Sequence, residues 1–166
     1  MNEIKLLGKK VIMDKSPLLL KYSPSDDWKD YWDVKSGNWS VEDGWLIGDE
    51  PGNKGGILFS KEFYEDNVMM TFSVKTALPA TRDLNAVFCA HWDDETDYLG
   101  TSYVCGLNGW FADKAGIERG ASGGRMTFRS LNSLYKYTPG KEIRMTCGAV
   151  DGHTFMLVDG EIVYRV

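Results

Sequence analysis

The segment from Cys89 to Tyr98 gathers an imidazole, an indole, four carboxylates and a phenol within ten residues. Carbohydrate sites use this mixture, because aromatic faces stack on the C–H face of a pyranose and carboxylates accept hydrogen bonds from its hydroxyls. A plainer interpretation is a solvated acidic loop with Trp92 folded into the core. The sequence leaves both interpretations open.

His91 lies at the end of an alternating run over residues 85–91. In a strand, His91 shares one face with Asn85 and Cys89, which favours a position in a groove over one in the core. A hydrogen-bonded structural histidine is the alternative.

Glu118 is the first choice for a reactive carboxylate, in the segment Gly116-Ile117-Glu118-Arg119. A general acid or base needs a pKa raised by burial and a second group across the groove, for which His91 or Asp93 is the nearest candidate. The alternative is a salt bridge between Glu118 and Arg119 or Arg125.

The predicted site therefore has two candidates for proton transfer, Glu118 and His91. Six further residues are predicted to contact the ligand, with the two tryptophans stacking on it: Asn85, Trp92, Asp93, Tyr98, Trp110 and Arg119. No residue is assigned to a metal and no cofactor is expected. The alternating Asp93, Glu95 and Asp97 leave a calcium site as an alternative to a solvated turn, without the glycine and terminal glutamate of an EF-hand.

The sequence predicts that the elements that position these residues are strands. In the segment 37–48, two short alternating runs carry Trp39 and Trp45 and flank Asp43-Gly44, which is typical of a hairpin with a type I′ turn. Two indole side chains on one hairpin need an extended surface to be buried against, which favours a second sheet packed on the first. Alternation also predicts strands over 67–75 and over three late runs joined by Asp-Gly turns: 142–150, 153–158 and 161–166. Residues 92–133 are predicted to be mainly loops with short strand pieces.

The length and composition of the chain indicate its fold class. With 166 residues, 43% apolar, the chain is long enough for one well-buried domain and short for two. Its 18 glycines and the lack of long helical periodicity predict an all-β, two-sheet antiparallel sandwich over residues 1–166. A net charge of −5 without a basic patch argues against a nucleic-acid partner.

No apolar run has the length of a membrane span or of an export signal, so no membrane association is expected. The three cysteines are odd in number and far apart: Cys89, Cys105 and Cys147. Their strand-like surroundings predict buried thiols, which fit a reducing cytoplasm.

Several motifs together resemble the concanavalin A-like lectin/glucanase superfamily over residues 17–166. They are the segments 37–48, 56–59, 106–110 and 116–119 and the late hairpin 157–163. Within that superfamily the chain resembles bacterial 3-keto-disaccharide hydrolase-like domains and their uncharacterised pectin-utilisation relatives. The resemblance implies a jelly roll whose concave face meets an oligosaccharide or sugar derivative. The laminarinase-like order of two glutamates and an aspartate is not found in residues 93–97, so that mechanism is not expected.

The resemblance also implies closing strands beyond the late hairpin, where this sequence ends at Val166. An uncovered sheet edge attracts another strand. Residues 1–16 are therefore expected to form an edge strand or arm, or a second copy of the chain to pair there as a homo-oligomer.

Two classes of function follow. The leading hypothesis is a carbohydrate-binding domain, in which Glu118 or His91 also transfers a proton if the chain is a glycoside hydrolase or a related sugar-cleaving enzyme. The alternative is a structural or assembly module that uses the sheet edge and aromatic surface.

Overall fold

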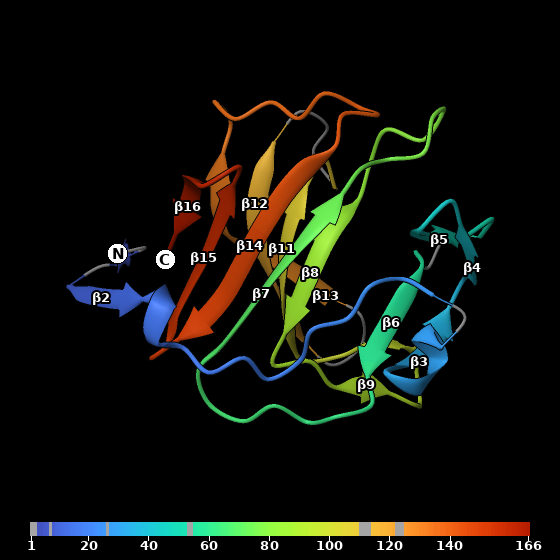
Figure 1. Cartoon of the computed structure of the whole chain (residues 1–166), viewed down its shortest axis with the longest axis horizontal. Coiled ribbons are helices and arrows are strands. Elements are labelled where there is room, and N and C mark those ends of the chain that lie inside the picture. The colour runs from blue at the N-terminus through green and yellow to red at the C-terminus, as the bar shows by residue number, and fades with distance from the viewer. Residues whose placement is uncertain (1–2, 7, 26, 53–54, 110–113, 122–124) are drawn as a thin grey trace. The chain divides into compact units, whose positions relative to one another are not determined.

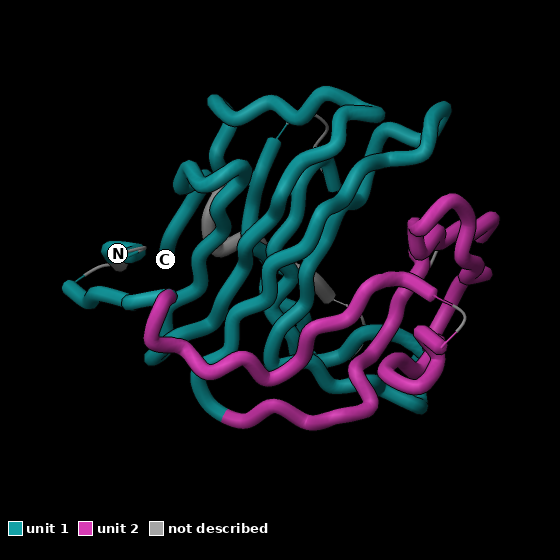
Figure 2. Tube along the Cα trace, in the orientation of Figure 1, with its two compact units in different colours: residues 1–13, 66–166 teal, residues 14–65 magenta. Residues whose placement is uncertain are grey.

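The computed structural model describes residues 3–6, 8–25, 27–52, 55–109, 114–121 and 125–166. Strands make up 52% of the structure and helices 4%, which confirms the all-β prediction. The chain divides into two compact units, one of residues 1–13 and 66–166 and the other of residues 14–65 (Figure 2). Each is described by itself below, and a single domain over residues 1–166 stays a prediction.

The larger unit contains two four-stranded antiparallel sheets (Figure 1). The first has the order β16-β15-β14-β7, with β7 (Val68–Val74), β14 (Ile143–Val150), β15 (His153–Val158) and β16 (Glu161–Arg165). The second has the order β13-β12-β11-β8, with β8 (Leu84–Phe88), β11 (Ser102–Leu107), β12 (Ala115–Ala121) and β13 (Arg125–Asn132). The predicted two-sheet sandwich is therefore confirmed. The second sheet comes largely from residues 92–133, where the sequence predicts mainly loops.

One apolar core joins the two sheets. Leu84, Ala86 and Phe88 of β8 are buried in the same cluster as residues of β14 from the facing sheet, among them Met145. Because side chains alternate along a strand, the residues between these positions face the opposite surface of the second sheet. Asn85 is one of them. We call this surface the outer face of the second sheet.

The cysteines occupy two different environments. Cys105 and Cys147 are fully buried and hydrogen-bonded to each other across the sandwich, as predicted for buried thiols. Cys89 is exposed, so the prediction is wrong for this residue. The strand ends at Phe88, and Cys89 adopts a left-handed backbone with φ of 50°, which interrupts the alternation on which the prediction relied.

The N-terminal segment forms a hairpin of β1 (Glu3–Leu6) and β2 (Lys9–Ile12), which pair with each other. Ile4 is only 2% exposed and packs with Phe155 and Leu157 of β15. Arg165 Nη1 donates a 2.6 Å hydrogen bond to the Lys5 carbonyl oxygen. The segment predicted as an edge strand or arm thus contacts the first sheet through side chains, while its described strand pairing is internal.

The smaller unit contains the predicted hairpin, formed by β4 (Asn38–Glu42) and β5 (Trp45–Asp49), and a second strand pair, β3 (Trp32–Ser36) with β6 (Ile57–Ser60). Asp43 and Gly44 have φ angles of 50° and 76°, as a type I′ turn requires. The indole of Trp39 lies against Gly48 and donates a 2.9 Å hydrogen bond to the Ser36 carbonyl oxygen. Trp39 is therefore a packing residue of this unit.

The remaining elements are short. The strand pair β9 (Trp92–Asp93) and β10 (Tyr98–Leu99) lies in the larger unit, and the two 3-10 turns are η1 (Met13–Lys15) and η2 (Trp28–Asp30). Neither of these turns, nor any other helix in the described part of the chain, has the length and apolar character needed to cross a membrane.

Replacing Ile4 with Ala tests the attachment of the N-terminal hairpin. Removing a buried aliphatic side chain leaves a cavity, so we expect the free energy of unfolding to fall by about 2–4 kcal/mol. Ile162→Ala is the matched control, because Ile162 is 42% exposed. Chemical denaturation compares the two variants, and equal losses would contradict the packing described here.

Candidate functional site

Two carboxylates border the same small space at one corner of the outer face of the second sheet. Glu118 lies on β12 directly opposite Val104 of β11, and its side chain is only 8% exposed. Asp83 immediately precedes β8. A Cβ atom built on Gly109 would lie 3.3 Å from Asp83 Oδ1 and 3.9 Å from Glu118 Oε1. Both carboxylates therefore come close to Gly109, where a side chain would contact them.

These carboxylates lie in an environment that disfavours negative charge. Burial, and to a smaller extent the charge of Asp83, raise the pKa of Glu118 from its ordinary 4.5 to about 7. Burial also raises the pKa of Asp83, against smaller lowering effects of a hydrogen bond from Asn85 and of the charge of Arg82. Among the described residues, the Glu118 carboxylate has neither a hydrogen-bond partner nor an ion-pair partner.

Tyr98 of β10 lies within the electrostatic influence of the same pair of carboxylates. Burial raises the pKa of its phenol, and the charges of Asp83 and Glu118 add to that effect. Its ring is half-buried. The hydroxyl group can both donate and accept a hydrogen bond at the site.

Asn108 completes the corner with a buried amide. It follows β11, is 5% exposed and donates a 3.2 Å hydrogen bond from Nδ2 to the Thr81 carbonyl oxygen. Its Oδ1 is buried and accepts no hydrogen bond from any part of the chain that the structure describes. An unsatisfied buried acceptor is unfavourable by about 1–3 kcal/mol.

The backbone at this corner has an uncommon conformation. Asp83 and Asn108 have φ angles of 66° and 51°, and the Asp83 amide donates a 3.3 Å hydrogen bond to the Asn108 carbonyl oxygen. Asp and Asn tolerate the left-handed region better than other side chains that have a Cβ atom. The hydrogen bond between the two residues holds the start of β8 beside the end of β11.

Three of the predicted site residues come together here: Asn85, Tyr98 and Glu118. Asn85 connects to the site through its hydrogen bond to Asp83, and its Oδ1 lies over Gly106, where a Cβ atom would be only 2.3 Å away. The charge that acts on Glu118 belongs to Asp83, which the sequence did not single out, and the pairing of Glu118 with His91 or Asp93 stays a prediction.

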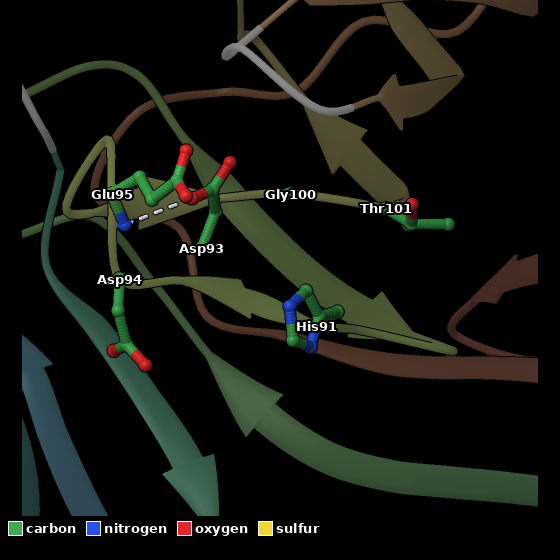
Figure 3. A pocket seen from close by; sticks show the side chains of 6 residues that line it. All are labelled: His91, Asp93, Asp94, Glu95, Gly100 and Thr101. Carbon is green, nitrogen blue, oxygen red and sulfur yellow. Dashed lines mark hydrogen bonds between the residues drawn. The ribbon is translucent and has the colours of Figure 1, made fainter.

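His91 and Asp93 instead line an open hollow of about 380 Å³ (Figure 3). The predicted common strand face of His91 and Asn85 is wrong, because β8 ends at Phe88. The backbone of His91 pairs with the segment at Gly100 and Thr101 through hydrogen bonds of 2.8 and 2.9 Å. The hollow is lined by His91, Asp93, Asp94, Glu95, Gly100 and Thr101.

The acidic residues of this hollow form a turn. Asp93 Oδ1 accepts hydrogen bonds of 3.0 and 3.3 Å from the backbone amides of Glu95 and Thr96. Figure 3 shows the carboxylate of Asp94 pointing away from those of Asp93 and Glu95. Within the described ranges, no three His, Cys, Asp or Glu side chains are grouped as a metal site requires, so the calcium alternative gains no support.

The remaining predicted ligand contacts lie elsewhere. Arg119 is directly opposite Tyr103, which is itself opposite Phe88 of the core, so strand alternation directs Arg119 away from the face that carries Glu118. Trp92 is half-buried and paired with the buried Leu99. Trp110 lies outside the described residues.

Sequence reasoning missed Asp83 and Asn108. Asp83 lies two residues before Asn85, the spacing that brings side chains to one strand face, and this signal was available in the sequence. Asn108 precedes a glycine directly after a strand, a pattern typical of a turn. Nothing local in the sequence shows that these two chain segments meet at one corner.

Replacing Glu118 with Gln tests the burial of this carboxyl group. Its folded-state pKa lies above its unfolded value, so its contribution to stability is greatest at low pH and is lost as the pH rises from 4.5 to about 7. We expect Glu118→Gln to be more stable than the natural protein by up to about 3 kcal/mol above pH 7, with a smaller difference toward pH 4.5.

Urea denaturation across this pH range measures the effect, with Glu161→Gln on exposed Glu161 as the control. A stability difference for Glu118→Gln that does not vary with pH would contradict the proposed environment of Glu118.

Of the comparisons with known proteins, the one with solved structures finds a similarity. No protein-family model matches the sequence, and no curated protein matches it. Among solved structures, the chain is similar to the carbohydrate-binding module CBM66 from Bacillus subtilis, with 12% sequence identity and a TM-score of 0.62. The similarity covers 81% of this chain and 78% of that one. At this identity the comparison shows a shared β-sandwich fold.

Proposed function

We propose that the chain binds a carbohydrate at the Asp83/Glu118 site, which we define as Asp83, Asn85, Tyr98, Asn108 and Glu118 around Gly109. The observation that carries the proposal is the buried carboxylate of Glu118, which has no partner among the described residues and lies beside Gly109 together with Asp83. The fold shared with a carbohydrate-binding module supports this choice of ligand class.

The chemistry of the site suits sugar hydroxyl groups. A buried carboxylate without a partner is unfavourable, and a hydroxyl donor from a ligand supplies the missing hydrogen bond. Asp83 offers a further acceptor, while the half-buried ring of Tyr98 offers a surface for stacking. Together these groups provide the directional contacts and the apolar surface that sugar recognition needs.

The proposal also covers the family that the sequence resembles. It includes membership of the concanavalin A-like superfamily, with the 3-keto-disaccharide hydrolase-like domains among the relatives. It also includes a cytoplasmic location, which is supported by the free, buried thiols of Cys105 and Cys147.

A second candidate function, cleavage of a sugar linkage, is favoured by one observation. A carboxyl group with a pKa of about 7 is half protonated at neutral pH, so Glu118 can donate a proton to a leaving oxygen. Asp83 is the second carboxylate that glycoside hydrolysis requires. In this version of the function Glu118 is the general acid, and His91, in the separate hollow, takes no part.

Substitutions test whether the sugar binds at the Asp83/Glu118 site or in the hollow at His91. We expect Asp83→Asn and Glu118→Gln each to weaken binding of the best sugar on a glycan array by about tenfold or more, because each removes a charged acceptor. His91→Ala and Asp93→Asn are the matched variants in the hollow and should leave affinity unchanged. Titration calorimetry measures all four variants. Loss of binding only in the two hollow variants would show that the sugar binds in the hollow. Absence of binding to any sugar would overturn the proposal.

Release of a product from the same sugar tests whether the site cleaves a sugar linkage. With Glu118 as general acid, the rate should fall as the pH rises through about 7, because the carboxyl group loses its proton. Glu118→Gln should abolish turnover at every pH. Chromatography of the sugar after incubation measures this, and turnover retained in Glu118→Gln would exclude Glu118 as the acid.

A further inference from the structure

Two of the three cysteines lie together inside the apolar core. Cys105 of β11 and Cys147 of β14 are both 0% exposed and belong to one cluster of buried residues. The two strands belong to different sheets of the sandwich. Because the two thiols are hydrogen-bonded to each other, their sulfur atoms are in contact across the space between the sheets. Neither thiol belongs to the proposed sugar site.

The neighbours of the two thiols leave them room to move closer. Ala86 of β8 lies directly opposite Cys105, and its side chain is a single methyl group. On the facing sheet, Cys147 lies between Met70 and Met156 of the adjacent strands. A disulfide needs a sulfur–sulfur distance of about 2.05 Å, which is shorter than a hydrogen-bonded contact. Methionine side chains are flexible and adapt to such a small change of the core.

We propose that Cys105 and Cys147 are a redox pair, which becomes a disulfide between the two sheets when the chain folds in the presence of a small organic disulfide. One thiolate attacks the small disulfide and releases its first thiol, and the other thiolate attacks the resulting mixed disulfide and releases the second thiol. The protein gives up two protons and two electrons, and the small disulfide takes up both. Without that oxidant the pair stays as two thiols, which agrees with the reducing compartment proposed above.

Burial determines when the disulfide can form. The hydrogen bond with Cys105 and burial raise the pKa of the Cys147 thiol, so the reactive thiolate is scarce in the folded protein. Both side chains are also closed to a small disulfide in solution. The exchange therefore takes place before the core closes or while it is open, and the folded core then protects the product.

The disulfide acts on the stability of the sandwich. It joins β11 to β14, which are far apart in the sequence, and therefore restricts the unfolded chain. For a link of this loop length in a protein of this size, we expect the melting temperature to rise by about 5–15 °C. Cys89 is exposed at the end of β8 and takes no part in this link.

Refolding of the full chain in two redox buffers tests the inference. The Cys89→Ser variant, which lacks the exposed thiol, is unfolded in denaturant and refolded with oxidised glutathione or with dithiothreitol. We expect the sample from oxidised glutathione to lose both free thiols and the mass of two hydrogen atoms, and peptide mapping to find Cys105 linked to Cys147. Its melting temperature should lie about 5–15 °C above that of the sample from dithiothreitol.

Cys147→Ala in the same Cys89→Ser background is the matched control. It keeps the single thiol of Cys105, so it should form no internal disulfide and gain no stability in oxidised glutathione. The main comparison uses one variant in two buffers and does not depend on the folding of this control. Two free thiols after refolding in oxidised glutathione would overturn the inference. A disulfide that lowers the melting temperature would also overturn it, because the native fold would then not accommodate the bond.

Discussion

The apolar core between the two sheets is the constraint on which the candidate site depends. Ile117 of β12 and Leu107 of β11 are fully buried in that core, and the two strands pair in continuous register from Ser102 to Leu107. Once Ile117 faces inward, strand alternation directs Glu118 to the outer face. The packing that stabilises the sandwich therefore also fixes a buried carboxylate that has no partner among the described residues.

The second determinant is the corner at which β8 begins and β11 ends. Leu84 and Leu107 are opposite each other in the sheet, so the residues just beyond them, Asp83 and Asn108, meet at the same corner. Their left-handed backbones and the hydrogen bond between them direct the chain around Gly109. A carboxylate and an amide are thus brought to Glu118 by backbone geometry.

The sequence predicted the elements whose alternation is uninterrupted, including the 37–48 hairpin and the strands near residues 67–75 and 142–166. It also predicted Glu118, Asn85 and Tyr98, which the structure brings to one corner. It misplaced His91, because a single left-handed residue at Cys89 ends the alternation and no side-chain pattern marks that change. The meeting of Asp83 with Asn108 depends on the pairing of β8 with β11, which is a long-range property that local patterns do not contain.

The burial of Glu118 connects stability to ligand choice. Desolvation raises the free energy of its charged form, and it also strengthens any interaction that this charge makes with a bound group. A donor with a positive charge gains most from such an environment, because its attraction to the carboxylate is least screened by water there. By linkage, a ligand that prefers the charged form must lower the pKa of Glu118 when it binds. The buried carboxyl group of Glu118 is therefore where the stability of the fold and the choice of a ligand are coupled.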